Sequence, residues 1–528
     1  MKRKTFLGIL AATAATPVIA SCTSNSGSSS STTTSASRAE LPEALKFDPT
    51  AYEEKTETFT QDGEEIEVTY RQWTGVVYCT NPVDTDYQCM NIKQPITVGG
   101  KAVDTTKMPI VMALNIGGYM PYAPNLENSM GGPMGPGGIT GGGMGAAGMG
   151  PGGMGGGADA GGNNGVAAGV GTQVGAGGGR VNNGDYALTA GCLTVDPGAR
   201  GRSNQAADGT YYGKAPAAII DLKCAVRYLR ANADNGIPGN VERIVCTGSS
   251  AGGALSSLLG ASGDSSLYDS YLEEVGAADA SDAIYAAAPY CPITDLEHAD
   301  AAYEWALRSV TSDRVTVDAT VSEELAAQFP AYLASLGVKG LEITAIANTM
   351  LDEHLIPSAE EYLEGLSDSD RESYLQSNSW ITYENGKASF TWADYTEHIG
   401  RSKSAPAFDT FDLSGAENIE FGSATVNARH FTEYSAAHQN TEVEQEVLDL
   451  LPLMNPVHFL KDQNPSRSKH WFMRVGAADT DTSPTVLAIL AALAEAAGDN
   501  VDVAYYWDQG HGTNTDPEKF AAWVKSLA

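Results

Sequence analysis

The chain has 528 residues, of which 42% are hydrophobic, so it is long enough for one large domain with an insertion or for two ordinary domains. Its net charge of −33 argues against nucleic acid and anionic lipid surfaces as partners, because both repel an acidic protein. It contains no CxxC pair and no HExxH motif, so a zinc or iron–sulfur site is not expected and no cofactor is implied.

Residues 1–21 have the pattern of a secretory signal, with a basic start followed by an apolar run that is too short to span a membrane comfortably. The run ends in Ile19-Ala20-Ser21-Cys22, which resembles the bacterial lipobox, where cleavage leaves a cysteine that receives lipid. We therefore expect a protein of the bacterial cell envelope, attached to a membrane through lipid on Cys22. The alternative is an ordinary secretory signal that ends near a cysteine by chance.

Residues 22–45 are rich in Ser and Thr, a composition that predicts a solvated tether rather than a packed element. The six cysteines beyond Cys22 form an even set, as expected for an oxidising compartment. Cys79 and Cys89 flank a turn-rich segment and could close a hairpin, whereas the others fit buried thiols.

Residues 46–295 alternate short apolar strands with amphipathic helices, a pattern typical of a mostly parallel sheet covered on both faces. Residues 131–180 interrupt this part; they are half glycine without periodicity and predict a flexible surface insertion. Apolar residues on one face predict a helix over 217–230. The predicted strands are 108–115, 186–195, 242–247 and 284–289.

Residues 296–454 have mostly helical periodicity and are rich in Glu, Ser and Tyr, which predicts an inserted helical cap. The sheet is expected to resume in residues 455–528. In this last part Thr482 or Ser483 and Asp516 are expected to cap helices, and Gly498 to end one. The predicted strands here are 470–476 and 501–507, and the predicted helices are 484–497 and 517–527.

One predicted strand runs directly into Gly248-Ser249-Ser250-Ala251-Gly252 and then into a helix-compatible run. This strand, sharp turn and helix form the nucleophile elbow of the α/β-hydrolase fold. The turn is strained, so the positions that flank the serine must be small. A bare GxSxG could arise by chance in a chain so rich in Gly, Ser and Ala, but the strand before it and the helix after it favour Ser250 as a nucleophile.

A serine hydroxyl is a weak nucleophile, so it needs a base within hydrogen-bond reach and an acid that orients the base. Among the eight histidines, His511 alone lies in a glycine-flanked loop directly after the last predicted strand, and we expect it to be the base. The predicted acid is Asp479, which follows another strand. Asp481 and Asp508 are its competitors.

The segment from Asn115 to Tyr119 follows the first strongly buried strand, which is the position of the oxyanion loop in esterases of this fold. We expect the backbone amides of Gly117 and Gly118, with that of Ala251, to hold the developing alkoxide. The alternative interpretation is a simple turn at the end of a strand.

With these residues placed, most of residues 66–528 apart from the glycine insertion resembles the bacterial tannases, esterases that cleave galloyl esters. The resemblance is carried by several short stretches. They are NIGGYMP (115–121), PGARGR (197–202), GTYYGKAP (209–216), GSSAGG (248–253) and APAFD (405–409).

The resemblance also implies how a galloyl ring is bound. In Asp479-Thr480-Asp481 the first aspartate corresponds to the triad acid, and the second, Asp481, to a residue that binds phenolic hydroxyls. Lys403 and Glu417 resemble a lysine and a glutamate that grip the same ring. Two carboxylates and one ammonium can satisfy three adjacent hydroxyls together. Without the resemblance, Lys403 and Glu417 would be interpreted as solvated charges of the cap.

These patterns predict a tannase, a serine esterase that hydrolyses galloyl esters of tannins and simple gallates through an acyl-enzyme. The first alternative is a feruloyl or general carboxylesterase with the same triad, in which the ring-binding residues would be incidental. A serine peptidase with this fold is another. The alternative from a different class is a non-catalytic surface adhesin built on a hydrolase fold.

Overall fold

The structure is a computed structural model that describes residues 41–61, 63–126, 182–308, 310–312 and 315–528. Ten strands of this part of the chain form one mixed sheet. They are β1 (Glu53–Gln61), β2 (Glu64–Val77), β3 (Cys89–Val98), β4 (Lys101–Ala102), β5 (Pro109–Leu114), β6 (Leu193–Pro197), β7 (Asn240–Ser249), β8 (Ala286–Tyr290), β11 (His470–Gly476) and β12 (Asn500–Tyr506).

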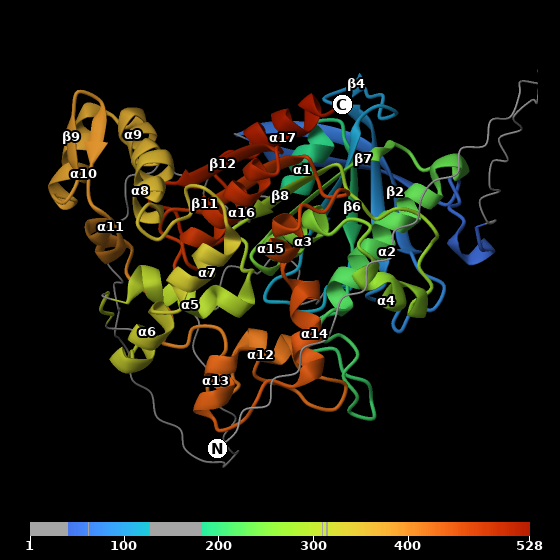
Figure 1. Ribbon diagram of the computed structural model, residues 1–528. Helices are drawn as coiled ribbons and strands as arrows, with labels where there is room; N and C mark the ends of the chain where they lie inside the picture. Colours follow the sequence, from blue (N-terminus) through green and yellow to red (C-terminus); the bar gives the residue numbers. More distant parts are fainter. Residues whose placement is uncertain (1–40, 62, 127–181, 309, 313–314) are drawn as a thin grey trace, which may run out of the picture. The chain divides into compact units, whose positions relative to one another are not determined.

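The strand order is β1-β2-β3-β6-β5-β7-β8-β11-β12, with β4 paired to β3 (Figure 1). Neighbours from β1 to β6 are antiparallel, and neighbours from β6 to β12 are parallel. The predicted α/β-hydrolase fold, a mostly parallel sheet flanked by helices, is confirmed. In such a sheet the functional residues gather at the carboxyl ends of the parallel strands.

Successive side chains of β5 pack into different cores, because side chains alternate across a sheet. Ile110 and Met112 belong to the larger core, and Val111 belongs to a second core on the opposite face. The larger core is completed by α2 (Ala217–Ala231), α3 (Ala251–Ala261) and α16 (Thr485–Ala496), and the second by α1 (Asn183–Thr189) and α17 (Pro517–Ser526).

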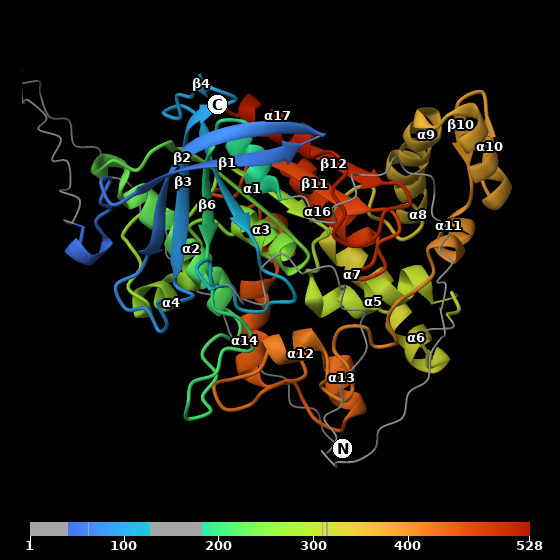
Figure 2. The same cartoon turned by 180° about the vertical axis from the view of Figure 1, so that it is seen from behind.

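The chain between β8 and β11 is mostly helical. Its helices are α5 (Leu296–Leu307), α6 (Ala319–Ala326), α7 (Phe329–Leu336), α8 (Ile346–Thr349), the π-helix η4 (Met350–Leu355), α9 (Ile356–Gly365), α10 (Asp368–Ser377), α11 (Trp392–Ile399), α12 (Ala416–Glu420), α13 (Glu433–His438), α14 (Gln445–Met454) and α15 (Pro456–Lys461). A small hairpin, β9 (Thr382–Glu384) and β10 (Lys387–Ser389), lies among them. Figures 1 and 2 show α12–α14 below the sheet and the hairpin beyond the β12 edge. The remaining short helices are η1 (Glu43–Leu45), η2 (Ala233–Asn235), η3 (Ser266–Tyr268) and α4 (Asp269–Glu274).

One predicted strand is partly wrong. Residues 186–195 were expected to be extended, but α1 occupies Asn183–Thr189 and the strand begins only at Leu193. The side chain of Asn182 accepts a hydrogen bond from the amide of Gly184 and so caps the helix. Ala187 and Leu188 are buried in two different clusters, so the helix is apolar on more than one side and imitates a buried strand.

Two expectations near the start of the described chain also change. The predicted tether, residues 22–45, ends too late, because Leu45 is 1% exposed and its carbonyl accepts a hydrogen bond from Asn232. Cys79 and Cys89, which could have closed a hairpin, are not linked, and all six cysteines of the described residues are free and buried. The signal, Cys22 and the glycine insertion at 131–180 lie outside the described residues. No helix in the described ranges is long and apolar enough to cross a membrane.

Candidate active site

Ser250 lies at the turn between β7 and α3, with a φ of 63° and a ψ of −123°. Such a backbone is costly for a residue with a side chain, so the surroundings must hold it in place. A Cβ added to Gly248 would lie 2.6 Å from the carbonyl oxygen of Gly252, and one added to Gly253 would lie 2.2 Å from that of Tyr290. Only glycine fits at these positions, which explains the sequence of the elbow and leaves the serine partly exposed above the sheet.

Two hydrogen bonds connect the three residues predicted as nucleophile, base and acid. His511 Nε2 lies 2.9 Å from Ser250 Oγ, and His511 Nδ1 lies 2.9 Å from Asp479 Oδ2. Asp479 follows β11, its side chain is inaccessible to solvent, and its second oxygen accepts the amide of Asp481. The three residues therefore have the arrangement in which a carboxylate orients an imidazole toward a hydroxyl.

The charge around His511 favours its protonated form. Burial is the largest single effect and lowers the pKa of the imidazole, but the charge and hydrogen bond of Asp479, together with the charge of Asp481, outweigh it, so the pKa of His511 is raised overall. Asp481 contributes in the same direction from 3.8 Å. An imidazolium that forms during a reaction would therefore be stabilised at this position.

The competing acid, Asp508, is occupied elsewhere. One of its carboxylate oxygens lies 2.7 Å from His398 Nε2, and the other accepts a hydrogen bond from the hydroxyl of Tyr374. Both partners belong to the region between β8 and β11. Asp508 thus connects that region to the loop that carries His511.

The segment after β5 lies against the elbow. The amide of Gly252 donates a hydrogen bond to the carbonyl of Ile116 over 2.9 Å, so the segment and the first turn of α3 are fixed together. The amides of Gly117, Gly118 and Ala251 donate no hydrogen bond to any described residue. These three amides are therefore free to donate to another group, which an oxyanion hole requires.

Lys403 and Asp481 lie near the histidine. The hydroxyls of Tyr303 and Ser402 both donate to the carbonyl of Thr480, over 2.9 and 2.7 Å, and so fix the Lys403 segment to the loop after β11. The charge of Lys403 acts to lower the pKa of His511, opposing the carboxylates. The ammonium also lies 4.1 Å above the ring of Phe408.

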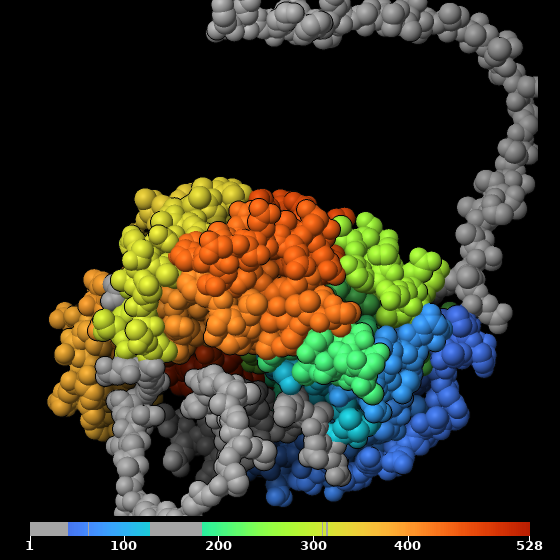
Figure 3. Space-filling model, turned by 90° about the horizontal axis from the view of Figure 1, so that it is seen from below, coloured from blue at the N-terminus to red at the C-terminus, as the bar shows by residue number. Residues whose placement is uncertain are grey.

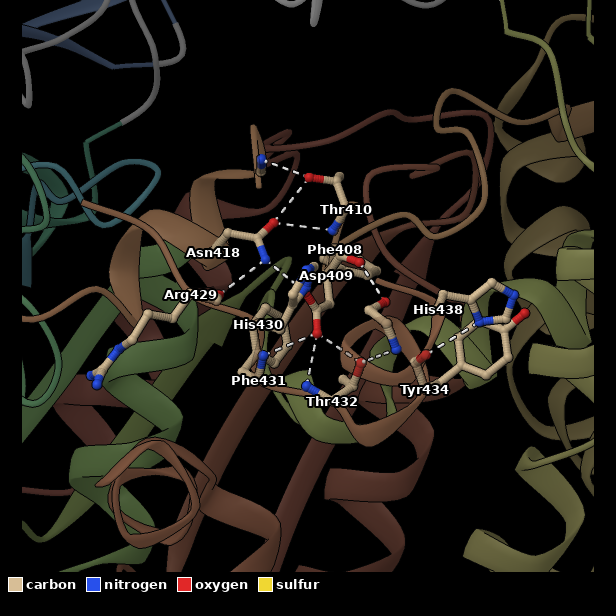
Figure 4. A network of polar contacts seen from close by, with 12 residues as sticks. Phe408, Asp409, Thr410, Asn418, Arg429, His430, Phe431, Thr432, Tyr434 and His438 are labelled. Atoms are coloured by element: carbon tan, nitrogen blue, oxygen red, sulfur yellow. Dashed lines mark hydrogen bonds and ion pairs between the residues drawn. The ribbon is translucent and has the colours of Figure 1, made fainter. Parts of the chain in front are cut away.

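Glu417 lies on α12 and is 8% exposed. The next residue, Asn418, donates from its side chain to Asp409 over 2.6 Å (Figure 4). Asp409 is fully buried, and its carboxylate also receives hydrogen bonds from His430 and from Thr432. This carboxylate therefore fixes α12, and Glu417 with it, to the following loop.

Donor atoms of Cys291, Asp479 and His511 lie within 4.8 Å of one another. Both nitrogens of His511 already face partners, so an ion held by this group would disrupt the bonds to Ser250 and Asp479. Burial raises the pKa of Cys291 to about 12, which leaves it a thiol rather than a metal-binding thiolate. The cluster is better explained as an arrangement for proton transfer than as a metal site.

Comparison with known proteins places this geometry in a family. The BD-FAE family model matches residues 210–329, and a search of the curated proteins finds no match. The tannase of Fusobacterium nucleatum is 32% identical, with a TM-score of 0.70 and coverage of 92% of this chain and 99% of that one. The chain belongs to the tannase family. The tannin acyl hydrolase of Lactobacillus plantarum is 26% identical with a TM-score of 0.73, over 92% and 98% of the two chains.

Membership of the tannase family makes the chain a carboxylic ester hydrolase of the α/β-hydrolase fold. Further structures of a tannin acyl hydrolase, one with 3,4-dihydroxybenzoate and one with ethyl gallate, are 27% identical to this chain with TM-scores of 0.72 and 0.71. In both, 92% of this chain and 98% of the other are covered.

Arg202, which lies within the PGARGR stretch, has no role predicted from the sequence. Its Nε donates to the carbonyl of Gly118 over 2.6 Å. The buried ion pair between Arg401 and Glu304, at 2.6 Å with neither side chain exposed, was also missed. The only signal for Arg202 was its place in a stretch shared with tannases, and nothing in the local sequence indicated the ion pair.

Proposed function

We propose that the protein is a tannase in the strict sense, a galloyl esterase that works through an acyl-enzyme. Ser250 attacks the ester carbonyl while His511 takes its proton and later returns it to the leaving alcohol. Asp479 orients His511, and the amides of Gly117, Gly118 and Ala251 receive the developing alkoxide. The observation that carries this proposal is the pair of 2.9 Å contacts that connect Ser250, His511 and Asp479.

The ring of the acyl group is assigned to Lys403, Glu417 and Asp481. Three adjacent phenolic hydroxyls offer donors and acceptors that two carboxylates and an ammonium can satisfy. The position of Asp481 beside His511 and the buried side chain of Glu417 support this assignment. The complex of a related tannin acyl hydrolase with ethyl gallate supports the same class of substrate.

The test is the ratio of kcat/KM for methyl gallate to that for methyl benzoate. A site that hydrogen-bonds hydroxyls leaves polar groups unpaired when the hydroxyls are absent, and such sites reject the stripped analogue by up to about 10⁴-fold. We expect a wild-type ratio well above one hundred. Glu417→Ala and Asp481→Ala should each lower the ratio by damaging the gallate rate, because benzoate never used those contacts.

The matched control is Glu433→Ala, which removes an exposed carboxylate from α13 in the same region of the chain. It should leave both rates unchanged within about twofold. A wild-type ratio near one would overturn the galloyl assignment and leave a general carboxylesterase. So would a ratio that neither Glu417→Ala nor Asp481→Ala changes.

A further inference from the structure

Two hydrogen bonds from a single residue hold the loop that carries the amides of the oxyanion hole. Arg202 Nε donates to the carbonyl of Gly118, and the backbone amide of Arg202 donates to the carbonyl of Tyr119 over 2.9 Å. We propose that Arg202 is a positioning residue of the oxyanion hole, which fixes the Gly118 peptide and supplies positive charge behind it. This inference rests on the esterase reaction proposed above, but not on its galloyl specificity.

The loop needs an external support because its backbone is strained. Gly118 and Tyr119 have φ values of 55° and 54°, and the second of these is unfavourable for a residue with a side chain. Gly118 is also exposed, so solvent competes for its polar groups. If the peptide after Gly118 were free to rotate, the amides of Gly117 and Gly118 would no longer point toward the oxyanion.

The segment that carries Arg202 packs directly on the loop. A Cβ added to Gly201 would lie 2.3 Å from the amide nitrogen of Pro121, so the two backbones are in contact. Ala199 and Tyr122 also exchange a pair of backbone hydrogen bonds of 2.9 and 3.0 Å. The guanidinium of Arg202 therefore extends from a segment whose backbone is held firmly in place, as precise positioning requires.

The charge of Arg202 is not neutralised by a close acid. No carboxylate of the described residues lies within ion-pair distance of its guanidinium, although Glu417 and Glu420 act on it from farther away. Glu420 is fully buried, and neither of its carboxyl oxygens has a hydrogen-bond partner among the described residues. Burial raises the pKa of Glu420 to about 8, so this group is mostly neutral at pH 7.

Arg202 therefore lies between α12 and the loop of residues 115–119, which carries the amides of the oxyanion hole. The amide of Ala215 donates to the carbonyl of Glu420 over 3.0 Å, and that of Tyr211 to Ala424 over 2.9 Å, which joins the segment after β6 to the α12 region. Figure 3 shows the green segment that follows β6 beside the orange residues of this region and the cyan segment that follows β5. The cation therefore lies directly beside the loop of the oxyanion hole.

The experiment measures kcat and KM of Arg202→Met with methyl gallate and with methyl benzoate. Both esters form an alkoxide in the same hole, so we expect kcat to fall by about 10- to 100-fold for both, with KM within about twofold. Inhibition by benzeneboronic acid, which forms a tetrahedral adduct with the serine, should weaken by a similar factor. Arg202→Lys keeps the charge and should recover part of the loss, whereas Arg202→Gln should not.

The control is Arg230→Met, because Arg230 also donates to a backbone carbonyl, that of Val241, but at the end of α2. It should leave kcat and the boronic acid inhibition unchanged. Glu420→Gln should also leave kcat and the boronic acid inhibition nearly unchanged at pH 7, because an amide replaces an acid that is already mostly uncharged.

Three results would overturn the proposal. The first is an unchanged kcat and boronic acid inhibition in Arg202→Met, or in Arg202→Gln if the methionine variant does not fold. The second is a loss confined to KM for methyl gallate, which would make Arg202 a ring-binding residue. The third is a loss in Arg202→Lys as large as in Arg202→Gln, because the charge would then contribute nothing. A wild-type gallate to benzoate ratio near one would defeat the galloyl assignment while the benzoate measurement still tested Arg202.

Discussion

The choice between Asp479 and Asp508 as the acid is open to a direct test. Asp479→Asn should lower kcat by about 10⁴-fold, because an amide cannot hold the imidazole in the required tautomer. It should also move the acidic limb of the kcat/KM profile to lower pH. His511 acts as a base only in its neutral form. The Asp479 carboxylate raises the pKa of His511, whereas burial lowers it. Burial remains after the substitution, so the pKa of His511 falls.

Asp508→Asn is the matched control for that experiment. Asp508 bonds to His398 and Tyr374, so its loss should change stability and leave the acidic limb in place. A larger loss of kcat in Asp508→Asn than in Asp479→Asn would show that the acid has been assigned wrongly.

The contact between Ser250 and His511 could be predicted from the sequence, because the elbow of this fold requires a strand, a glycine-rich turn and a later loop in a fixed order. The contact of Arg202 with the carbonyl of Gly118 could not be predicted, since the two residues are 84 positions apart in the chain. The reason is physical: a residue at a strained turn is marked by its local sequence, whereas a supporting residue is defined only by tertiary contacts.

At the scale of elements, the prediction succeeded where burial and periodicity agree. Residues 470–476 were predicted as a strand and are β11, and residues 217–230 correspond closely to α2. The prediction failed at α1, a short helix that is buried on more than one side. Such a helix has no polar face, so its sequence does not show the helical period of 3.6 residues.

The caps of the last helices show why side-chain roles are less predictable than element positions. Asp516 does precede α17, but its side chain makes no cap hydrogen bond. Its carboxylate instead accepts hydrogen bonds from Arg474 and Tyr506, which the sequence places 42 and 10 residues away. A buried cation outcompetes the backbone amides for this carboxylate because charge-assisted hydrogen bonds are the stronger ones.

The Asp409 network is the element-scale feature with the clearest consequence for specificity. Asp409→Asn should lower Tm by about 5 °C, because the amide nitrogen that replaces one carboxylate oxygen is a donor and then faces the donor of either Asn418 or Thr432. The gallate rate should fall more than the benzoate rate, since Asn418 is adjacent to Glu417. Thermal unfolding and the two kcat/KM values measure both effects.

Asp412→Asn provides the comparison, because Asp412 lies in the same loop but is exposed and accepts hydrogen bonds from the amide and the hydroxyl of Ser414. It should shift Tm by less than about 1 °C. An unchanged gallate to benzoate ratio in Asp409→Asn, despite a lower Tm, would show that the network supports the fold without orienting Glu417.

At the scale of the whole molecule, the residues assigned to the site come from distant parts of the chain. Ser250 comes from the middle of the sheet, His511 from the loop after its last strand, and Glu417 from the helical region between β8 and β11. Leu41–Ala528 forms one compact unit, so these parts share a single body. The mostly parallel sheet explains why the first two meet, because its strands end at the same edge.

The attachment of this body to a membrane stays a prediction from the sequence, and its electrostatics make it testable. A net charge of −33 repels an anionic bilayer, so attachment would depend on lipid at Cys22 rather than on surface charge. In a bacterial host the wild-type protein should partition into detergent and resist release by high salt, whereas Cys22→Ser should become aqueous or keep its signal uncleaved. An aqueous wild-type protein with a free amino terminus would refute the anchor, and so would its release by salt alone.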